Sequence, residues 1–275
     1  MNQKLLRGLE IVLAAVLVVS LVMVIRTQME YAQGASTYAE AADVAKLPKL
    51  TAIPIPTMRR DGEADQFDPN LTLLAEVDLD ELKQKNPDVV GWISIPETEL
   101  SYPFLQGEEN GYYLKHTWRK YGSNLGSIFM DWRSNAELTD FNTVIYGHRT
   151  NNRSMFGSLK DYKDLEYWSA HPSIYLAWAG GVYRYDIFAA YEASVEGPVY
   201  EFAERDADGR EAFIASCLEL SEIETGIVPT ADDQILTLST CTGRGYQNRW
   251  VVQGVLTETY VRDEDVSDVE AVDEL

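Results

Sequence analysis

The sequence is short of the residues that metal, phosphate and nucleic-acid sites require. Its 275 residues include two cysteines and three histidines, and they contain neither a calcium-binding loop of the EF-hand kind nor a glycine-rich phosphate loop. Asp and Glu number 44 against 23 Lys and Arg, which gives a formal net charge of −21. So acidic a chain repels the phosphates of nucleic acids. We therefore expect no metal, no cofactor and no nucleic-acid partner.

The two cysteines, Cys217 and Cys241, are too few for a disulfide-rich scaffold, although an even number in an exported chain permits one bridge. Cys217 falls in a predicted helix over residues 208–220, where Phe213, Ile214 and Leu218 recur with it at helical spacing. We expect it to be buried and to act as a small hydrophobic residue. Cys241 lies at the end of a predicted strand and needs a different explanation.

The N-terminus carries one long apolar run. Residues from Ile11 to Ile25 are apolar except for Ser20, and Lys4 and Arg7 precede the run. Fifteen residues is short for a membrane-spanning helix, which takes about 20, so the length also fits a cleaved signal peptide. No pair of small residues follows promptly to mark a cleavage site. We therefore expect an uncleaved anchor with a cytoplasmic N-terminus and the rest of the chain outside the cell membrane.

These features predict five segments along the chain. They are a cytoplasmic N-terminus at 1–8, a transmembrane anchor at 9–26, an extracellular stalk at 27–68, a folded domain at 69–262 and an acidic tail at 263–275. The stalk lacks sustained periodicity and holds three prolines between Leu47 and Pro56. The tail carries seven carboxylates and no base after Arg262. An interaction tail is one interpretation of it, and the composition favours the other, a solvated and disordered terminus.

The predicted domain consists mainly of short strands. We expect them at 89–95, 127–130, 143–146, 174–178, 182–188, 234–240 and 249–256, with a tight hairpin at Ala179-Gly180-Gly181. Asp78 caps a short predicted helix, with Glu81 three residues on, and a second helix covers 208–220. Many short strands without regular alternation with helices predict a mainly β fold, a barrel or sandwich with added helices.

Cys241 is the candidate nucleophile because it ends a strand and opens a loop that contains Gly243 and Gly245. A strand end fixes a side chain while the loop exposes it. A thiol also needs a base or a cation nearby to become a thiolate. His148, which follows the strand at 143–146, is the candidate partner, whereas His116 and His171 are expected to be structural.

An acyl-transfer site also needs a group that stabilises the oxyanion. Arg249 begins the strand after Cys241, across a seven-residue loop. Two consecutive antiparallel strands place the end of one beside the start of the next, so Arg249 is expected near Cys241. Arg244, inside the loop, is the rival candidate.

Several segments resemble the sortases. Thr237-Leu238-Ser239-Thr240-Cys241 is similar to the signature that closes the nucleophile strand of that family. The segment from Asn142 to His148 resembles its histidine strand, and Arg249-Trp250-Val251-Val252 resembles the arginine strand that follows. The segments at 86–93, 126–131 and 154–162 look like class B sortases. The resemblance covers about residues 79–256.

The resemblance implies that residues 69–262 are a sortase-like catalytic domain. Its fold would be an eight-stranded sortase-type β-barrel with added N-terminal helices and one helix before the cysteine strand. It implies a membrane-anchored transpeptidase that cleaves a C-terminal sorting signal of the Asn/Ser-Pro-x-Thr type after Thr. Cys241 would form the thioester, His148 would be the general acid for the leaving amine, and Arg249 would hold the substrate carbonyl and the oxyanion. Ser239 and Thr240 would line the substrate groove. The partners would be secreted proteins that bear the signal, and a peptidoglycan precursor or other amine acceptor.

Two other functions stay open on the residues alone. A hydrolytic cysteine protease shares the Cys and the His, but a papain-type enzyme places its nucleophile at a helix start and orients its imidazole with a buried Asn or Asp. A non-catalytic extracellular binding module on the same barrel would have a thiol of ordinary reactivity.

Overall fold

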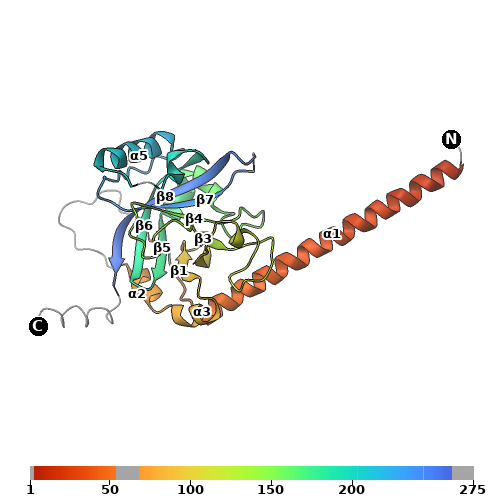
Figure 1. Cartoon of the computed structure of the whole chain (residues 1–275), viewed down its shortest axis with the longest axis horizontal. Helices are drawn as coiled ribbons and strands as arrows, with labels where there is room; N and C mark the ends of the chain where they lie inside the picture. Colours follow the sequence, from red (N-terminus) through yellow and green to blue (C-terminus); the bar gives the residue numbers. More distant parts are fainter. Residues whose placement is uncertain (1–2, 54–67, 203, 244, 262–275) are drawn as a thin grey trace, which may run out of the picture.

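The computed structural model describes residues 3–53, 68–202, 204–243 and 245–261. Eight strands of this part form a closed barrel in the order β1-β2-β3-β4-β7-β8-β6-β5 (Figure 1). The pairs β2/β3 and β4/β7 are parallel, and the other pairs are antiparallel. The strands are β1 (Val89–Ser94), β2 (Ser101–Gln106), β3 (Ile128–Met130), β4 (Asn142–Tyr146), β5 (Ser173–Trp178), β6 (Gly181–Ser194), β7 (Ile235–Cys241) and β8 (Asn248–Tyr260). The predicted mainly β barrel is confirmed.

In the described part of the chain, three helices precede the strands of the barrel, and two more lie between strands along the chain. They are α1 (Gln3–Val44), α2 (Pro69–Ala75), α3 (Leu79–Lys85), α4 (Leu165–Ala170) and α5 (Ala207–Leu220), with short 3-10 turns η1 (Tyr112–Leu114), η2 (Leu159–Lys163) and η3 (Pro198–Tyr200). Asp78 caps α3 through a hydrogen bond from the Glu81 amide, as predicted. Helix α5 is the predicted helix before the cysteine strand, and it begins at Ala207 because Asp206 caps it.

Two hydrophobic clusters divide the interior. The larger fills the barrel and includes Leu236 and Leu238 of β7 with Trp250 and Val252 of β8. The smaller lies between α5 and the outer face of the same strands, which contribute Ile235, Val251 and Val255. Alternate residues of β7 and β8 therefore point to opposite sides of the barrel wall.

The predicted hairpin at 179–181 is confirmed, since Trp178 of β5 pairs with Gly181 of β6. Gly181 has a φ of +137°, and a Cβ there would lie 2.0 Å from the carbonyl oxygen of Tyr260. Strand β2 was not predicted, because Pro103 lies inside it and proline argues against a strand. The structure accommodates Pro103 opposite Trp92 of β1.

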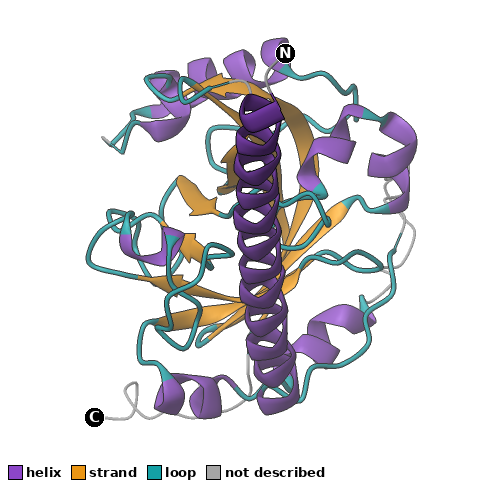
Figure 2. Cartoon of the chain, turned by 90° about the vertical axis from the view of Figure 1, so that its right-hand side faces the viewer, coloured by secondary structure: helices purple, strands orange, loops and turns teal. Residues whose placement is uncertain are grey.

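Helix α1 corrects part of the predicted stalk. The segment after residue 26 was expected to be irregular, but α1 continues as one unbroken helix to Val44 (Figure 2). Its N-terminal end protrudes far from the barrel (Figure 1). The physical reason is tertiary packing, because Tyr38, Ala41 and Ala45 are buried in the larger cluster. Residues 54–67 and the acidic tail at 263–275 lie outside the described residues.

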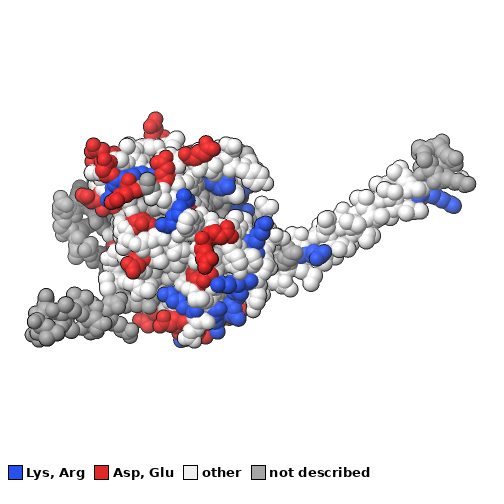
Figure 3. All heavy atoms as spheres, viewed as in Figure 1, with Lys and Arg blue, Asp and Glu red and all other residues white. Residues whose placement is uncertain are grey.

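The protruding part of α1 is apolar on all sides. By length and composition it is the one helix of the described chain that fits a membrane span, and none of its most apolar window is buried. In Figure 3 it is white over most of its visible surface, with basic side chains near its outer end and nearer the domain. A helix that is apolar all round has no aqueous face.

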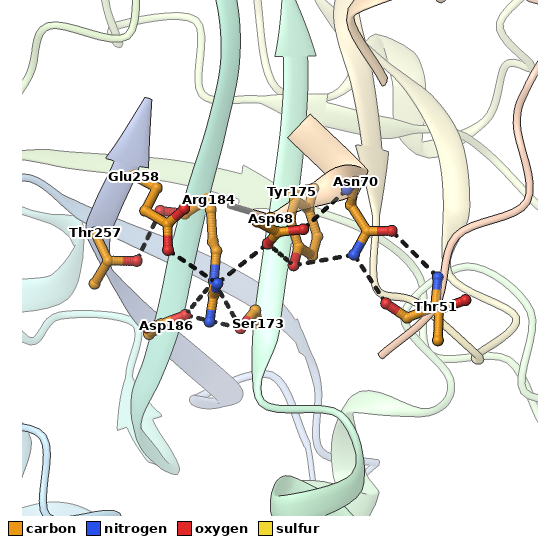
Figure 4. A network of polar contacts seen from close by, with 9 residues as sticks. All are labelled: Thr51, Asp68, Asn70, Ser173, Tyr175, Arg184, Asp186, Thr257 and Glu258. Atoms are coloured by element: carbon orange, nitrogen blue, oxygen red, sulfur yellow. Dashed lines mark hydrogen bonds and ion pairs between the residues drawn. The ribbon is translucent and has the colours of Figure 1, made fainter. Parts of the chain in front are cut away.

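A buried ion network fastens α2 to the barrel (Figure 4). Arg184 of β6 is 4% exposed. Its guanidinium lies 3.1 Å from Asp68, 2.8 Å from Asp186 and 3.0 Å from Glu258. Tyr175 of β5 also donates a hydrogen bond of 2.6 Å to Asp68, which caps α2. One cation therefore balances carboxylates from the start of α2 and from two strands.

We predict that Arg184→Met lowers the free energy of unfolding by about 3–5 kcal/mol, because it leaves buried carboxylates without their cation. Urea unfolding followed by circular dichroism measures the change. The matched control is Lys85→Met, which breaks an exposed pair with Glu81 at 3.4 Å and should cost about 0.5 kcal/mol or less. Equal midpoints for the two variants would contradict the prediction.

Candidate active site

Strand register brings the three candidate catalytic residues to one end of the barrel. Cys241, the last residue of β7, pairs directly with Arg249 of β8. On the other side of β7 the parallel register ends with Tyr146 opposite Ser239, and His148 follows two residues after the end of β4. The intervening Gly147 stays bonded to β7, since its amide donates to the Ser239 carbonyl and its carbonyl accepts from the Thr240 hydroxyl. Cys241 therefore lies between Arg249 and the segment that carries His148, and we call these three residues the row. Since Cys241 continues the alternation of Ile235, it lies with its partner Arg249 on the outer side of the barrel wall.

The two cysteines have opposite surroundings, and both are free thiols. Cys241 is exposed at the start of the loop at 242–247. Cys217 is 1% exposed and its sulfur lies 3.3 Å from the hydroxyl of Tyr191. Burial raises the pKa of the Cys217 thiol to about 11, and hydrogen bonds from Tyr191 and Gln253 offset only part of that rise. The prediction of a buried Cys217 is confirmed.

We predict that iodoacetamide at pH 7.5 modifies one cysteine per folded chain and that peptide mapping places it at Cys241. A pKa of about 11 leaves roughly one Cys217 thiol in three thousand ionised at that pH, and its burial blocks access as well. Cys217 should react only after unfolding in urea. Modification of Cys217 at a comparable rate in the folded chain would contradict this.

The imidazole of His148 is oriented by a backbone carbonyl. Its Nε2 lies 2.7 Å from the carbonyl oxygen of Leu114. A carbonyl oxygen only accepts, so Nε2 carries the proton in this contact and Nδ1 is the nitrogen that gains and loses one. The half-buried ring also packs against Gly126, where a Cβ would lie 2.9 Å from His148 Cδ2.

Arg249 is half-buried, and its guanidinium is folded onto the neighbouring loop. Its Nη1 donates to the carbonyl oxygens of Tyr246, at 3.0 Å, and Asn248, at 3.1 Å. The structure therefore brings the backbone of Arg249 beside Cys241 and shows its side chain holding the loop. The rival candidate, Arg244, lies outside the described residues.

Ser239 and Thr240 lie beside the row in different ways. Thr240 is 2% exposed, and its hydroxyl donates to the carbonyl oxygen of Gly147 at 2.7 Å. This bond joins β7 to the segment that carries His148, and Thr240 does not present its hydroxyl to a groove. Ser239 is on the same side as Cys241 and is 1% exposed, because Tyr200 covers it, with its hydroxyl 2.8 Å from Ser239 Oγ.

Tyr200 and Tyr146 form a wall next to Ser239 that the sequence did not predict. Their rings are stacked with centroids 6.3 Å apart and an angle of 13° between the planes. Burial raises the pKa of Tyr200 to about 12, and the nearby positive charge of Arg249 opposes that rise. Tyr146 stood inside the histidine motif, but no sequence pattern connected it with Tyr200, which lies in η3.

The carboxylate of Asp131 holds the Tyr146 hydroxyl in place. The Tyr146 hydroxyl donates to Asp131 at 2.9 Å, and Arg133 and Asn110 donate to the same carboxylate. Burial alone would raise the pKa of Asp131, but the hydrogen bonds, chiefly from Arg133, outweigh it and lower the pKa. An ionised Asp131 therefore holds the tyrosine wall in place at neutral pH.

Arg149, the residue after His148, ties the histidine segment to the loop after Cys241. Its Nη1 donates to the carbonyl oxygen of Thr242 at 2.5 Å, and its guanidinium occupies the space where a Cβ of Gly243 would stand. Gly243 has a φ of +80°.

No group of three or more metal-binding side chains is found among the described residues.

Comparison with known proteins agrees with this architecture. Residues 93–257 match the family described as Sortase domain. The curated sortase B of Listeria monocytogenes is 36% identical over 183 residues, which cover 65% of this chain and 74% of that protein. Sortase B of Staphylococcus aureus is 34% identical over 164 residues, covering 59% and 67%.

Solved structures show the same likeness. A Staphylococcus aureus sortase B–substrate complex matches with a TM-score of 0.68 and 25% identity, covering 84% of this chain and 99% of that chain. A Bacillus anthracis protein described as similar to sortase B matches with a TM-score of 0.68 and 30% identity, covering 84% and 98%.

Proposed function

From the premise that this chain belongs to the sortase family, in class B, and is a cysteine transpeptidase of the cell-wall-anchoring kind, we propose that Cys241, His148 and Arg249 are its catalytic residues. The observation that carries the assignment is that Cys241, at the end of β7, pairs with Arg249 of β8 on one side and has on the other side the end of β4, which His148 follows. We further propose a sorting signal of the Asn/Ser-Pro-x-Thr type, cleaved after Thr. One solved relative is a complex of sortase B with substrate.

In the proposed reaction the Cys241 thiolate attacks the carbonyl carbon of the signal's Thr. The C–N bond breaks, the leaving amine takes a proton from His148, and a thioester to Cys241 remains. An amine of a cell-wall precursor then attacks the thioester and releases the thiolate, while His148 takes up the proton. Because Leu114 holds Nε2, the proton passes through Nδ1 of His148.

The substrate would lie along the outer face next to Ser239, where Tyr146 and Tyr200 supply the wall. Ser239 is retained as a groove residue in this proposal, with its hydroxyl shared with Tyr200. Thr240 supports the groove from the inner side through its bond to Gly147.

Arg249 would stabilise the oxyanion after its guanidinium turns from the loop carbonyls toward the bound carbonyl. We predict that Arg249→Ala lowers kcat/KM for a sorting peptide by about 10²-fold, which is the effect of removing one oxyanion donor. Arg149→Ala is the comparison, because it removes a neighbouring guanidinium that binds the Thr242 carbonyl. A larger loss in Arg149→Ala than in Arg249→Ala would contradict the assignment.

We also propose that α1 anchors the protein in the cell membrane by a single pass, with the barrel outside. The support is the exposed and uniformly apolar segment of α1 and the basic residues at its N-terminal side. The partners would then be secreted proteins with a sorting signal and an amine acceptor held at the same membrane.

The test incubates the full chain in detergent micelles with a panel of sorting-signal peptides, with and without an oligoglycine or a diaminopimelate-type amine. Mass spectrometry reads the products. Cleavage after Thr with the amine joined to the new end supports the proposal and identifies the motif. If the peptide is hydrolysed and no amine is ever joined to the new end, the result would favour a hydrolytic protease. No cleavage together with an unreactive Cys241 would favour a binding module.

A further inference from the structure

The segment at 112–127 forms one wall of the pocket that holds His148. The Leu114 carbonyl accepts the hydrogen bond from Nε2, and Gly126 packs against the ring. Gly126 has a φ of +61°, and a Cβ there would lie within 2.9 Å of the Leu114 carbonyl and of His148 Cδ2. The position of the imidazole therefore depends on where these two residues of the segment lie.

The C-terminal end of α1 is hydrogen-bonded to the same segment. The buried hydroxyl of Tyr38 donates to the carbonyl oxygen of Gly126 at 2.6 Å and lies 2.9 Å from Ser127 Oγ. The Trp118 indole donates to the carbonyl oxygen of Thr37 at 2.7 Å. The backbone of α1 also comes close at Gly34, where a Cβ would lie 2.7 Å from Leu125 Cδ2.

We propose that Tyr38 is a positioning residue for the reaction: through the Gly126 carbonyl it fixes the wall that holds the His148 imidazole. The proposal rests on the proposed role of His148 as general acid. One residue, Gly126, carries both contacts, since its carbonyl oxygen accepts from Tyr38 and its α-carbon packs on the ring. Loss of the Tyr38 hydroxyl lets Gly126 move, and the ring loses its fixed direction.

The contact also joins the catalytic centre to the protruding helix. Tyr38 lies in the same unbroken helix, Gln3–Val44, as the apolar segment. Four residues that α1 contacts, Trp118, Leu125, Gly126 and Ser127, belong to residues 112–127. The Tyr38 ring also packs edge-on against Tyr102 of β2, with centroids 5.3 Å apart, and this contact does not depend on the Tyr38 hydroxyl. Among these contacts, the hydrogen bond to Gly126 is the one that joins the Tyr38 hydroxyl to the wall against which His148 packs.

The test compares Tyr38→Phe with Tyr162→Phe in the full chain in detergent micelles. Tyr162 is the matched control, since it is fully buried and its hydroxyl also donates to a backbone carbonyl, that of His171, at 2.6 Å. Each variant loses a buried hydroxyl that donates to a backbone carbonyl, so thermal denaturation should show similar small decreases in Tm. Only Tyr38→Phe should lower kcat, by about tenfold, with KM for the sorting peptide unchanged within about twofold.

Two further variants keep the outcome decisive. Gly126→Ala places a methyl group against the ring and should lower kcat more than Tyr38→Phe does, again with little change in KM. His148→Ala in the same assay separates the two proposals, because full activity in that variant would remove the proposed function itself. Inactive His148→Ala together with wild-type kcat in Tyr38→Phe, or equal losses in Tyr38→Phe and Tyr162→Phe, would overturn the positioning role alone.

Discussion

A Cys241→Ala variant is expected to lose peptide cleavage and amine transfer together, by about 10⁴-fold or more. The reason is that the alanine offers no atom to form the thioester, and removal of a covalent nucleophile abolishes the whole route. The measurement is the rate of product formation from a sorting peptide, followed by mass spectrometry. The Cys241 side chain is exposed, so its replacement should not disturb the fold, and Tm should stay close to that of the unaltered chain.

Cys217→Ala is the matched control. It removes the other thiol from the cluster beneath α5, which lowers stability by creating a small cavity but leaves the row of candidate residues intact. We expect it to keep its activity. Activity in Cys241→Ala above a tenth of the unaltered rate would show that Cys241 is not the nucleophile. Loss of activity in a folded Cys217→Ala would also contradict the assignment.

A His148→Ala variant is expected to lower kcat by about 10²–10⁴-fold, the usual contribution of a positioned general acid. The leaving amine would depart without a proton, and the thiol would lose its neighbouring base. The structural reason for choosing His148 is that it follows directly after β4, the parallel neighbour of the strand that ends at Cys241. Its Nε2 bonds to the Leu114 carbonyl, which leaves Nδ1 to exchange the proton. Steady-state kinetics with the sorting peptide measures the effect.

The control for this variant is His171→Gln. The Nδ1 of His171 lies 3.2 Å from the Pro96 carbonyl oxygen, at the end of α4, so its substitution should leave kcat unchanged. A His148→Ala variant that retains more than half of the kcat of the unaltered chain would exclude the general-acid role. A comparable loss of kcat in a folded His171→Gln would mean that the assay reports on stability.

The row of catalytic candidates was predictable in part. Cys241 and Arg249 end and begin consecutive antiparallel strands, and such strands bring those residues together whatever the rest of the fold. His148 is different, because β4 and β7 are parallel and about 90 residues apart in the sequence. No local pattern predicts such a pairing, so only the family resemblance placed His148 beside Cys241.

The residues that the sequence did not reveal act through long-range contacts. Tyr200 reaches Ser239 from a short 3-10 turn, and Leu114 reaches His148 from a loop. The helical extension of α1 to Val44 was missed because its stability comes from burial of Tyr38 and Ala41 against the domain. By contrast, the Asp78 cap and the hairpin glycine were predictable, because their hydrogen bond and backbone angles are local.

The most direct test of the thioester mechanism is to measure the intact mass of the full chain after brief reaction with a sorting peptide and acid quenching. We predict an added mass equal to the peptide fragment that ends in Thr, located on Cys241 by proteolytic mapping and discharged when an amine such as triglycine is added. Amine discharge should yield the fragment joined to triglycine. Turnover of the peptide with no adduct on Cys241, or an adduct on another residue, would contradict the proposed thioester mechanism.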